Sequence, residues 1–147
     1  MAEFIAPVVE WVIGVVTGEA LAELLQAAGL DAFGEVRKSW TGVVINWPPC
    51  SVMPRSTDFD PEGTAVHGTH ALTIKFGVAG DDPDQVAADA LGYMAAIDQA
   101  IAASVGTWPA VVSKVFVSRH DYGPLFAKDG SFAKFPEMHL EVETYES

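Results

Sequence analysis

The chain has 147 residues, the usual size of one domain, and half of them are apolar, so it can build a hydrophobic core. Its 20 acidic and 8 basic residues give a formal net charge of -12, which argues against a surface that grips nucleic acid through clustered Lys and Arg. The lone Cys50 excludes an intramolecular disulfide and a cysteine-based zinc site. We expect one domain over residues 1–147, with an N-terminal helical region over 1–38 and a sheet with a central helix over 40–147.

Apolar side chains at helical spacing predict a helix over residues 7–28, with Val8 and Val12 on its apolar face. Gly14 and Gly18 weaken its middle, so the segment is either one broken helix or two short ones. Its apolar stretch is shorter than the roughly 20 residues that span a bilayer. It also lacks the basic flank and cleavage site of a signal peptide. We expect an amphipathic helix that packs on the domain or on a neighbour, and no membrane partner.

Two strands and a long connection are predicted before the central helix. Alternating apolar residues predict a strand over residues 41–47, which Pro48 and Pro49 end because neither can donate to a sheet ladder. Residues 50–63 are rich in Pro, Asp and Gly and are predicted to form a long loop. Residues 65–78 form the clearest strand, and its apolar face consists of Leu72, Ile74, Phe76 and Val78.

The central helix is predicted to begin after a turn and to run to about residue 104. Asp81 or Asp82 can cap its N-terminus, and Pro83 suits the first turn. Its buried stripe is predicted to contain Val86, Ala90, Met94, Ile97, Ile101 and Val105.

A Val-rich strand over residues 110–118, a loop over 120–134 and a last strand over 137–145 complete the chain. The order of elements is α-β-β-α-β-β. It predicts an α+β fold with an N-terminal helix and a four-stranded, mainly antiparallel sheet covered by one central helix. The side chains of the last strand that face this helix are predicted to be Met138, Leu140 and Val142.

The four histidines are the candidates for a metal site. His67 and His70 are three residues apart, so on a strand they point to opposite faces and cannot jointly hold one ion. His120 and His139 lie on or beside neighbouring strands and could approach each other. Surface or loop-anchoring roles account for these side chains better, and we expect neither a metal nor a cofactor.

Arg119, His120 and Asp121 follow a strand end and are the candidate for acid–base catalysis. No nucleophile stands at a recognised spacing from them, and the sequence lacks a phosphate-binding loop, a dinucleotide fingerprint and a nucleophile elbow. We therefore predict no catalytic residues and no enzyme activity. The alternative is a small enzyme or ligand-binding domain that uses His120 and Asp121.

The last strand carries acidic side chains on the face opposite its apolar side: Glu137, Glu141 and Glu143. One interpretation is an ordinary solvated sheet face. The other is the wall of a pore that carries DNA, because a negative surface repels phosphate and lets DNA slide.

Large apolar side chains are concentrated in the predicted loops, where they either fold back as a satellite core or dock on a partner. The candidate partner contacts are Trp47, Met53, Phe59, Tyr122, Leu125, Phe126 and Phe132.

The chain resembles the tail terminator (tail-completion or neck) proteins of long-tailed bacteriophages. The resemblance is carried by the order and length of the elements: the N-terminal helical region, the strand ending in Pro48-Pro49, the long strand 70–78, the helix opened by Asp81-Asp82-Pro83, and the final strand with His139-Leu140-Glu141. It covers nearly the whole chain and contains no catalytic residue.

The resemblance implies a ring, usually a hexamer, that caps the tail tube and joins it to the head-side connector protein. It implies that Glu137, Glu141 and Glu143 line the channel, that the loops over 48–63 and 122–134 contact neighbouring proteins, and that DNA passes through without specific binding. The expected location is the virion neck or tail, and the host cytoplasm during assembly. Another neck position, such as a head-closure or adaptor protein, and an accessory domain that binds a partner at a sheet edge are the remaining alternatives.

Overall fold

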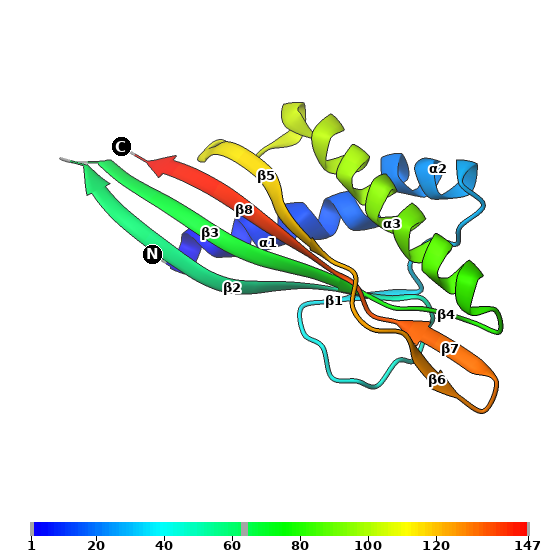
Figure 1. Cartoon of the computed structure of the whole chain (residues 1–147). Helices are drawn as coiled ribbons and strands as arrows, with labels where there is room; N and C mark the ends of the chain where they lie inside the picture. Colours follow the sequence, from blue (N-terminus) through cyan, green and yellow to red (C-terminus); the bar gives the residue numbers. More distant parts are fainter. Residues whose placement is uncertain (1, 63–64, 147) are drawn as a thin grey trace.

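A computed structural model describes residues 2–62 and 65–146 of the chain. Three helices lie on one face of a long, twisted five-stranded sheet, and a small second sheet lies at one end of it (Figure 1). We call the face covered by the helices the inner face and the opposite face the open face. The helical elements are α1 (Ala2–Thr17), α2 (Glu19–Ala27), α3 (Pro83–Ala103) and the short 3-10 helix η1 (Val105–Thr107).

The large sheet has the strand order β1-β2-β3-β8-β5. β1 pairs with β2 in parallel, and the other pairs are antiparallel. Its strands are β1 (Glu35–Arg37), β2 (Pro49–Glu62), β3 (Ala65–Phe76), β5 (Val112–Asp121) and β8 (Glu137–Glu146). The small sheet has the order β4-β7-β6, with β4 (Val78–Gly80), β6 (Phe126–Lys128) and β7 (Ser131–Lys134). The predicted α+β class is confirmed, but the four-stranded layout is wrong.

The predictions of a strand over residues 41–47 and of a loop over residues 50–63 are both wrong, because the first segment is a loop and the described part of the second belongs to a strand. Residues 41–47 form no strand, whereas residues 50–62 of the predicted loop belong to β2; Gly63 lies outside the described residues. β1 pairs only with residues 49–51, so the rest of β2 is an edge where a residue without an N–H, such as Pro54, is tolerated. Prolines therefore mark an edge strand here and not a loop.

The N-terminal segment forms two helices separated at Gly18, which is the second of the two predicted alternatives. A Cβ at Gly18 would lie 2.8 Å from the carbonyl oxygen of Gly14, so the chain can pass closely over the preceding turn. Val8 and Val12 are buried in the domain's own core. The stretch Ile5–Ala27 is long and apolar enough to cross a membrane by length and composition, and 28% of its apolar window is buried inside the domain.

Asp82 begins α3 as predicted, because its carboxylate accepts hydrogen bonds from the backbone N–H groups of Asp84 (3.0 Å) and Gln85 (3.4 Å). The predicted stripe is buried from Val86 to Ile101. Val105 is the exception: it lies beyond the end of α3, in η1, and is 58% exposed.

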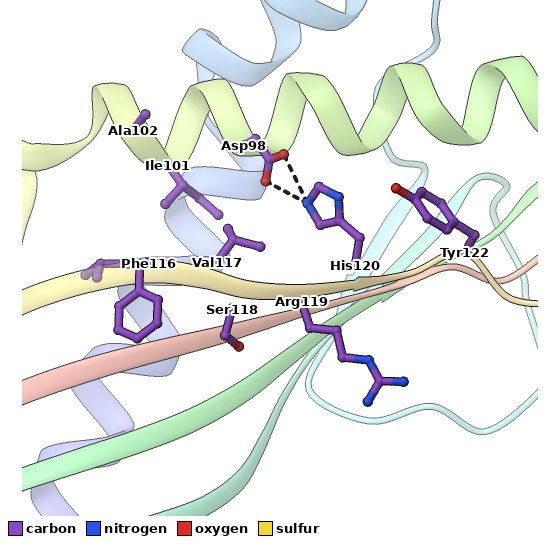
Figure 2. A pocket seen from close by; sticks show the side chains of 10 residues that line it. Asp98, Ile101, Ala102, Phe116, Val117, Ser118, Arg119, His120 and Tyr122 are labelled. Carbon is purple, nitrogen blue, oxygen red and sulfur yellow. Dashed lines mark hydrogen bonds and ion pairs between the residues drawn. The ribbon is translucent and has the colours of Figure 1, made fainter.

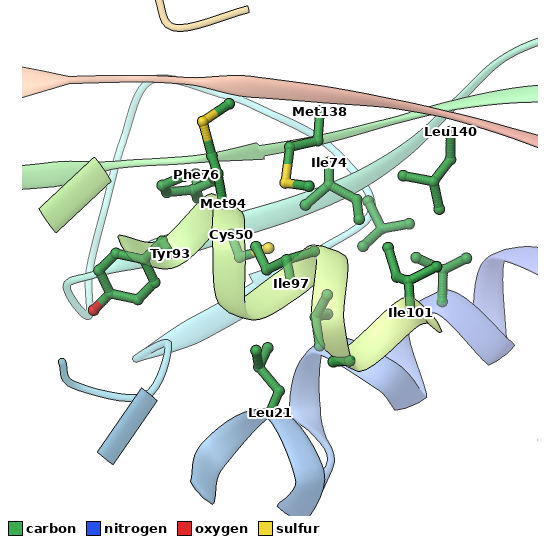
Figure 3. Close-up of a cluster of buried hydrophobic side chains, with 14 of the residues drawn as sticks. Leu21, Cys50, Ile74, Phe76, Tyr93, Met94, Ile97, Ile101, Met138 and Leu140 are labelled. Atoms are coloured by element: carbon green, nitrogen blue, oxygen red, sulfur yellow. The ribbon is translucent and has the colours of Figure 1, made fainter. Parts of the chain in front are cut away.

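The core lies between the inner face of the sheet and the three helices (Figure 3). Phe76 packs against the rings of Tyr93 on α3 and Phe33, with centroid distances of 5.5 and 6.0 Å. The predicted inward-facing side chains of both central strands are completely buried: Leu72, Ile74, Phe76, Met138, Leu140 and Val142. This prediction is confirmed, and burial of these side chains supplies most of the stabilisation that sheet and helices give each other.

A hairpin replaces part of the loop predicted over residues 120–134. β6 and β7 pair on either side of Asp129 and Gly130, whose φ angles are 50° and 78°. Two consecutive residues in the left-handed region form a tight hairpin turn, for which an Asp-Gly sequence is a strong signal. The prediction of a loop is therefore wrong for residues 126–134, where the Asp-Gly signal marks the turn between two short strands.

Cys50 is buried on β2, and burial strongly raises the pKa of its thiol. We expect the native protein to react negligibly with a thiol reagent at pH 8, and to react fully once it is unfolded in guanidinium, because only the thiolate is the nucleophile. A Ser131→Cys variant, which places a thiol on the exposed hairpin, is the positive control. Rapid labelling of the native unsubstituted protein would contradict this assignment.

Candidate functional site

The open face is the first candidate surface. Glu137, Glu141 and Glu143 alternate along β8 with fully buried side chains, so they project from the open face as predicted. Their proposed position in the lumen of a ring stays a prediction. Their cross-strand neighbours were not predicted. In the sheet register, Lys75 of β3 stands opposite Glu137, and Lys114 of β5 stands opposite Glu143.

The open face is therefore mixed in charge and not uniformly acidic. Four of the eight basic residues of the chain lie on it: Arg55, Lys75, Lys114 and Arg119. Opposite charges on directly paired strands offset the repulsion between carboxylates along β8. Sequence reasoning missed this arrangement because it considered β8 alone, and the partners of a strand are known only from the sheet order.

His139 of β8 also lies on the open face. Its Nδ1 accepts a hydrogen bond from the guanidinium of Arg55, since arginine can only donate, and the hydroxyl of Thr73 lies 3.4 Å from the same nitrogen. The ring hydrogen is therefore on Nε2. Burial, and then the positive charge of Arg55, lower the pKa of His139. This side chain cross-links strands β2, β3 and β8 in its neutral form.

His70 has the equivalent position on the inner face, where it is completely buried. Its two ring nitrogens lie 2.9 Å from the hydroxyls of Thr57 on β2 and Thr144 on β8. A Cβ at Gly68 would lie 2.9 Å from the Thr144 hydroxyl, so a glycine leaves room for this bridge. Burial lowers the pKa of His70, and we conclude that it is a neutral structural group.

The structure separates His120 from Asp121, the pair considered for catalysis. His120 points from β5 toward α3, where its Nε2 lies 3.0 and 3.1 Å from the two carboxylate oxygens of Asp98 (Figure 2). Asp121 stands opposite Glu137, accepts a hydrogen bond from the Gly123 N–H at 3.1 Å and pairs with Arg119 at 3.8 Å. The two side chains serve different faces of the strand and do not form one site.

A groove runs between α3 and the outer edge of β5 beside His120. It has a volume of about 610 Å³, and Figure 2 shows Ile101, Val117 and His120 along it. The His120–Asp98 pair closes one side of it. His120 and His139 do not approach each other, since the first faces inward and the second lies on the open face, so that part of the metal hypothesis was wrong. Among the described residues, no group of three His, Cys, Asp or Glu side chains is placed to hold a metal ion.

The loop between β1 and β2 and the segment from residue 122 to β7 lie at the same end of the molecule (Figure 1), and aromatic contacts join them. The rings of Trp40, Trp47 and Phe126 contact the ring of Phe135, with centroid distances of 5.6, 6.2 and 5.8 Å. We call the exposed side chains around this cluster the apolar end: Val43, Ile45, Trp47, Tyr122, Leu125 and Phe126.

The other predicted partner contacts lie elsewhere. Met53 and Phe59 belong to β2, and the Phe59 ring packs edge-on against His70 at 6.2 Å. Phe132 of β7 packs against the core and is only partly accessible. The apolar end therefore joins four of the seven predicted contacts and adds Val43 and Ile45, which had been assigned to a strand.

The loop that supplies Val43 and Ile45 is fixed by Glu35 of β1. The Glu35 carboxylate accepts hydrogen bonds from the N–H groups of Ile45 (2.7 Å) and Asn46 (2.8 Å) and pairs with Arg37. The Asn46 hydrogen bond is the largest cause of a lowered Glu35 pKa. One carboxylate thus holds the C-terminal part of the loop, while the side chains of Val43 and Ile45 are exposed.

We expect Glu35→Gln to loosen this loop without unfolding the domain, because an amide oxygen is a weaker acceptor than a carboxylate and loses the ion pair with Arg37. Amide hydrogen exchange at Ile45 and Asn46 should accelerate, while exchange in β3 and β8 stays unchanged. Glu19→Gln, on exposed α2, is the matched control. Equal protection of the loop in both variants would remove the role assigned to Glu35.

Comparisons with known proteins add one finding. The fold is similar to a chain in a structure described as the virion of a native gene transfer agent particle, with a TM-score of 0.45, 13% sequence identity and 86% of each chain covered. No family model matches the sequence, and no curated protein matches it.

Proposed function

We propose that the chain is a structural subunit of a phage-like virion that associates with copies of itself into a ring, as a tail terminator at the neck. The observation that carries the proposal of an assembly subunit is the placement of the apolar end, which we assign to docking on a neighbouring protein. Six large apolar side chains are exposed on the loop between β1 and β2 and on the segment that leads into the hairpin β6–β7, and two of them, Trp47 and Phe126, both contact Phe135. Glu35 holds the loop, and strand pairing holds the hairpin. A concentrated apolar patch of this kind is typical of a protein–protein contact.

The architecture supports assembly over catalysis. The helices cover only the inner face of the sheet, which leaves a charged open face and an apolar end on separate surfaces. Contacts within a ring are heterologous and need two other, different patches on each subunit. The strand ending in Pro48-Pro49, on which the resemblance to tail terminators partly depends, is absent; the long strand β3, the helix α3 and the final strand β8 support the proposal.

In the proposed ring the open face lines the channel, so its net electrostatic effect on DNA is weaker than an all-carboxylate wall would produce. Glu141 keeps uncharged neighbours, Ala71 and Phe116, in the sheet register, whereas Glu137 and Glu143 face lysines. The apolar end contacts the tail tube protein or the head-side connector protein. DNA passes without a specific site.

The alternative of a small enzyme or ligand-binding domain has less support from the geometry. Its two named residues, His120 and Asp121, project to opposite faces, and His120 is already paired with Asp98. The groove beside β5 lies along an unpaired strand edge, which is a better site for a polypeptide than for a small molecule.

The proposal is tested by light scattering after size exclusion at increasing protein concentration, with negative-stain images of the same fractions. We expect closed rings with a central channel. A protein that remains monomeric at all concentrations would contradict the proposal. The matched variant Trp47→Ser/Phe126→Ser should still form rings but lose attachment to the neighbouring neck or tube protein, since the apolar end serves stacking between rings.

A further inference from the structure

The large sheet has two long outer edges that lack a partner strand in the part of the chain that the structure describes. β1 covers only residues 49–51 of β2, so residues 52–62 form one edge, and the whole of β5 forms the other. Unpaired edges of this length readily accept another strand, and proteins normally shorten, charge or cover them. The two edges lie at opposite sides of the same sheet.

The two edges differ in net charge on the open face. β2 carries two aspartates and Arg55 there, and β5 carries Lys114, Arg119 and Asp121, so one edge has an excess negative charge and the other an excess positive charge. Asp58 and Asp60 alternate along β2 and are both exposed. Lys114 and Arg119 project to the same face from β5, where they stand opposite Glu143 and His139 of β8. In a chain with a net charge of -12, a basic edge is unusual, and it is complementary to the acidic edge of another copy.

The spacing of these charges is compatible with direct pairing. Lys114 and Arg119 lie four residues apart in the register of β8, from Glu143 to His139, which is about 13 Å at the rise of a strand. Two aspartates two residues apart span about 7 Å. They fit between the two bases, with about 3 Å left on each side for the long basic side chains to cross.

The inner sides of the two edges also fit each other. The groove beside β5 is lined on this side by the apolar side chains of Ile101, Val115 and Val117. An added strand places alternate side chains into such a groove. β2 of another copy would bring Thr57 and Phe59 there, since they share the inner face and Phe59 is 37% exposed.

We propose that the β2 edge of one copy pairs with the β5 edge of the next, so that the sheets of neighbouring copies become continuous. The occupant of the β5 groove is therefore a second copy of this chain. This inference deepens the proposed function and rests on it only for the closed ring. The contact joins two different patches, so it repeats around the assembly, and the twist between paired strands turns each copy relative to the last.

Charge reversal tests the contact. Asp58→Lys/Asp60→Lys and Lys114→Glu/Arg119→Glu should each weaken self-association at least tenfold, measured by analytical ultracentrifugation. A chain with all four substitutions should associate with itself again but not with the unsubstituted protein. Lys128→Glu/Lys134→Glu, on hairpin β6–β7, is the matched control and should associate normally. Circular dichroism and thermal unfolding must show an intact fold in each variant.

Cysteine cross-linking separates this inference from the proposed function. Next to β5, β2 of another copy runs antiparallel, so Asp60 lies beside Lys114 when the two aspartates sit between the bases. Mixing Asp60→Cys protein with Lys114→Cys protein should therefore give a disulfide-linked dimer. Either variant alone should give none, because the introduced cysteines of two identical copies lie on the same edge of each sheet. Rings without the cross-link, or rings that persist in both charge-reversed variants, would overturn edge pairing and leave the ring function standing. A cross-link without rings would support edge pairing and contradict the ring. Absence of both would overturn both.

Discussion

Replacing Phe76 with Ala is expected to lower the free energy of unfolding by about 3–5 kcal/mol. Phe76 is completely buried at the junction of β3, α3 and the segment after α2, where its ring contacts Tyr93 and Phe33. Its removal leaves a cavity that rigid neighbours cannot fill, in addition to the lost transfer free energy. Urea unfolding followed by circular dichroism measures the effect.

Phe126→Ala is the control of the same residue type. Phe126 is 53% exposed at the apolar end, so its replacement should change the free energy of unfolding by less than about 1 kcal/mol. The proposed docking to a neighbouring protein should weaken in the same variant. Comparable destabilisation by the two substitutions would mean that the core is not centred on the inner face.

Acidification is expected to destabilise the domain through His70. Burial lowers its pKa in the folded state below the ordinary value of 6.5, so the unfolded chain binds the proton more readily. The stabilisation is therefore present above about pH 6.5 and is lost as the pH falls from there toward the folded-state pKa. One such group contributes a slope of up to about 1.4 kcal/mol per pH unit, and His139 acts in the same direction.

His70→Gln should be less stable than the unsubstituted protein at pH 7.5, because it disturbs the bridge between Thr57 and Thr144. Its stability should nevertheless fall less steeply between pH 6.5 and 5. Urea unfolding across this range gives the slope. His67→Gln, on the opposite face of β3, is the matched control, because it removes a histidine without changing the bridge between Thr57 and Thr144. A slope unchanged by His70→Gln would show that His70 does not titrate on unfolding.

Periodicity predicted the elements that have one buried and one open face. Along β3 and β8, alternate side chains are buried completely, and along α3 the stripe from Val86 to Ile101 faces the sheet. The cap of α3 was also readable, because an Asp before Pro at a helix start has a specific hydrogen-bonding role. These features depend on local sequence, so a single sequence contains them.

Features that depend on distant partners could not be predicted. The apolar alternation at Val43 and Ile45 suggested a strand, but this segment is a loop held by Glu35, and no local pattern identifies that carboxylate. β2 was missed because its prolines are acceptable only on an edge, and an edge is known only from the sheet order. The bases opposite Glu137 and Glu143 were missed for the same reason.

The central position of β8 has a consequence for how the protein is made. β8 is the last strand in the described chain, yet it lies between β3 and β5 and pairs with both. During synthesis, β5 has no partner strand and one edge of β3 stays unpaired until β8 leaves the ribosome. Such late, non-local pairing slows folding and leaves aggregation-prone intermediates exposed. Premature termination before Glu137 should therefore yield an insoluble product.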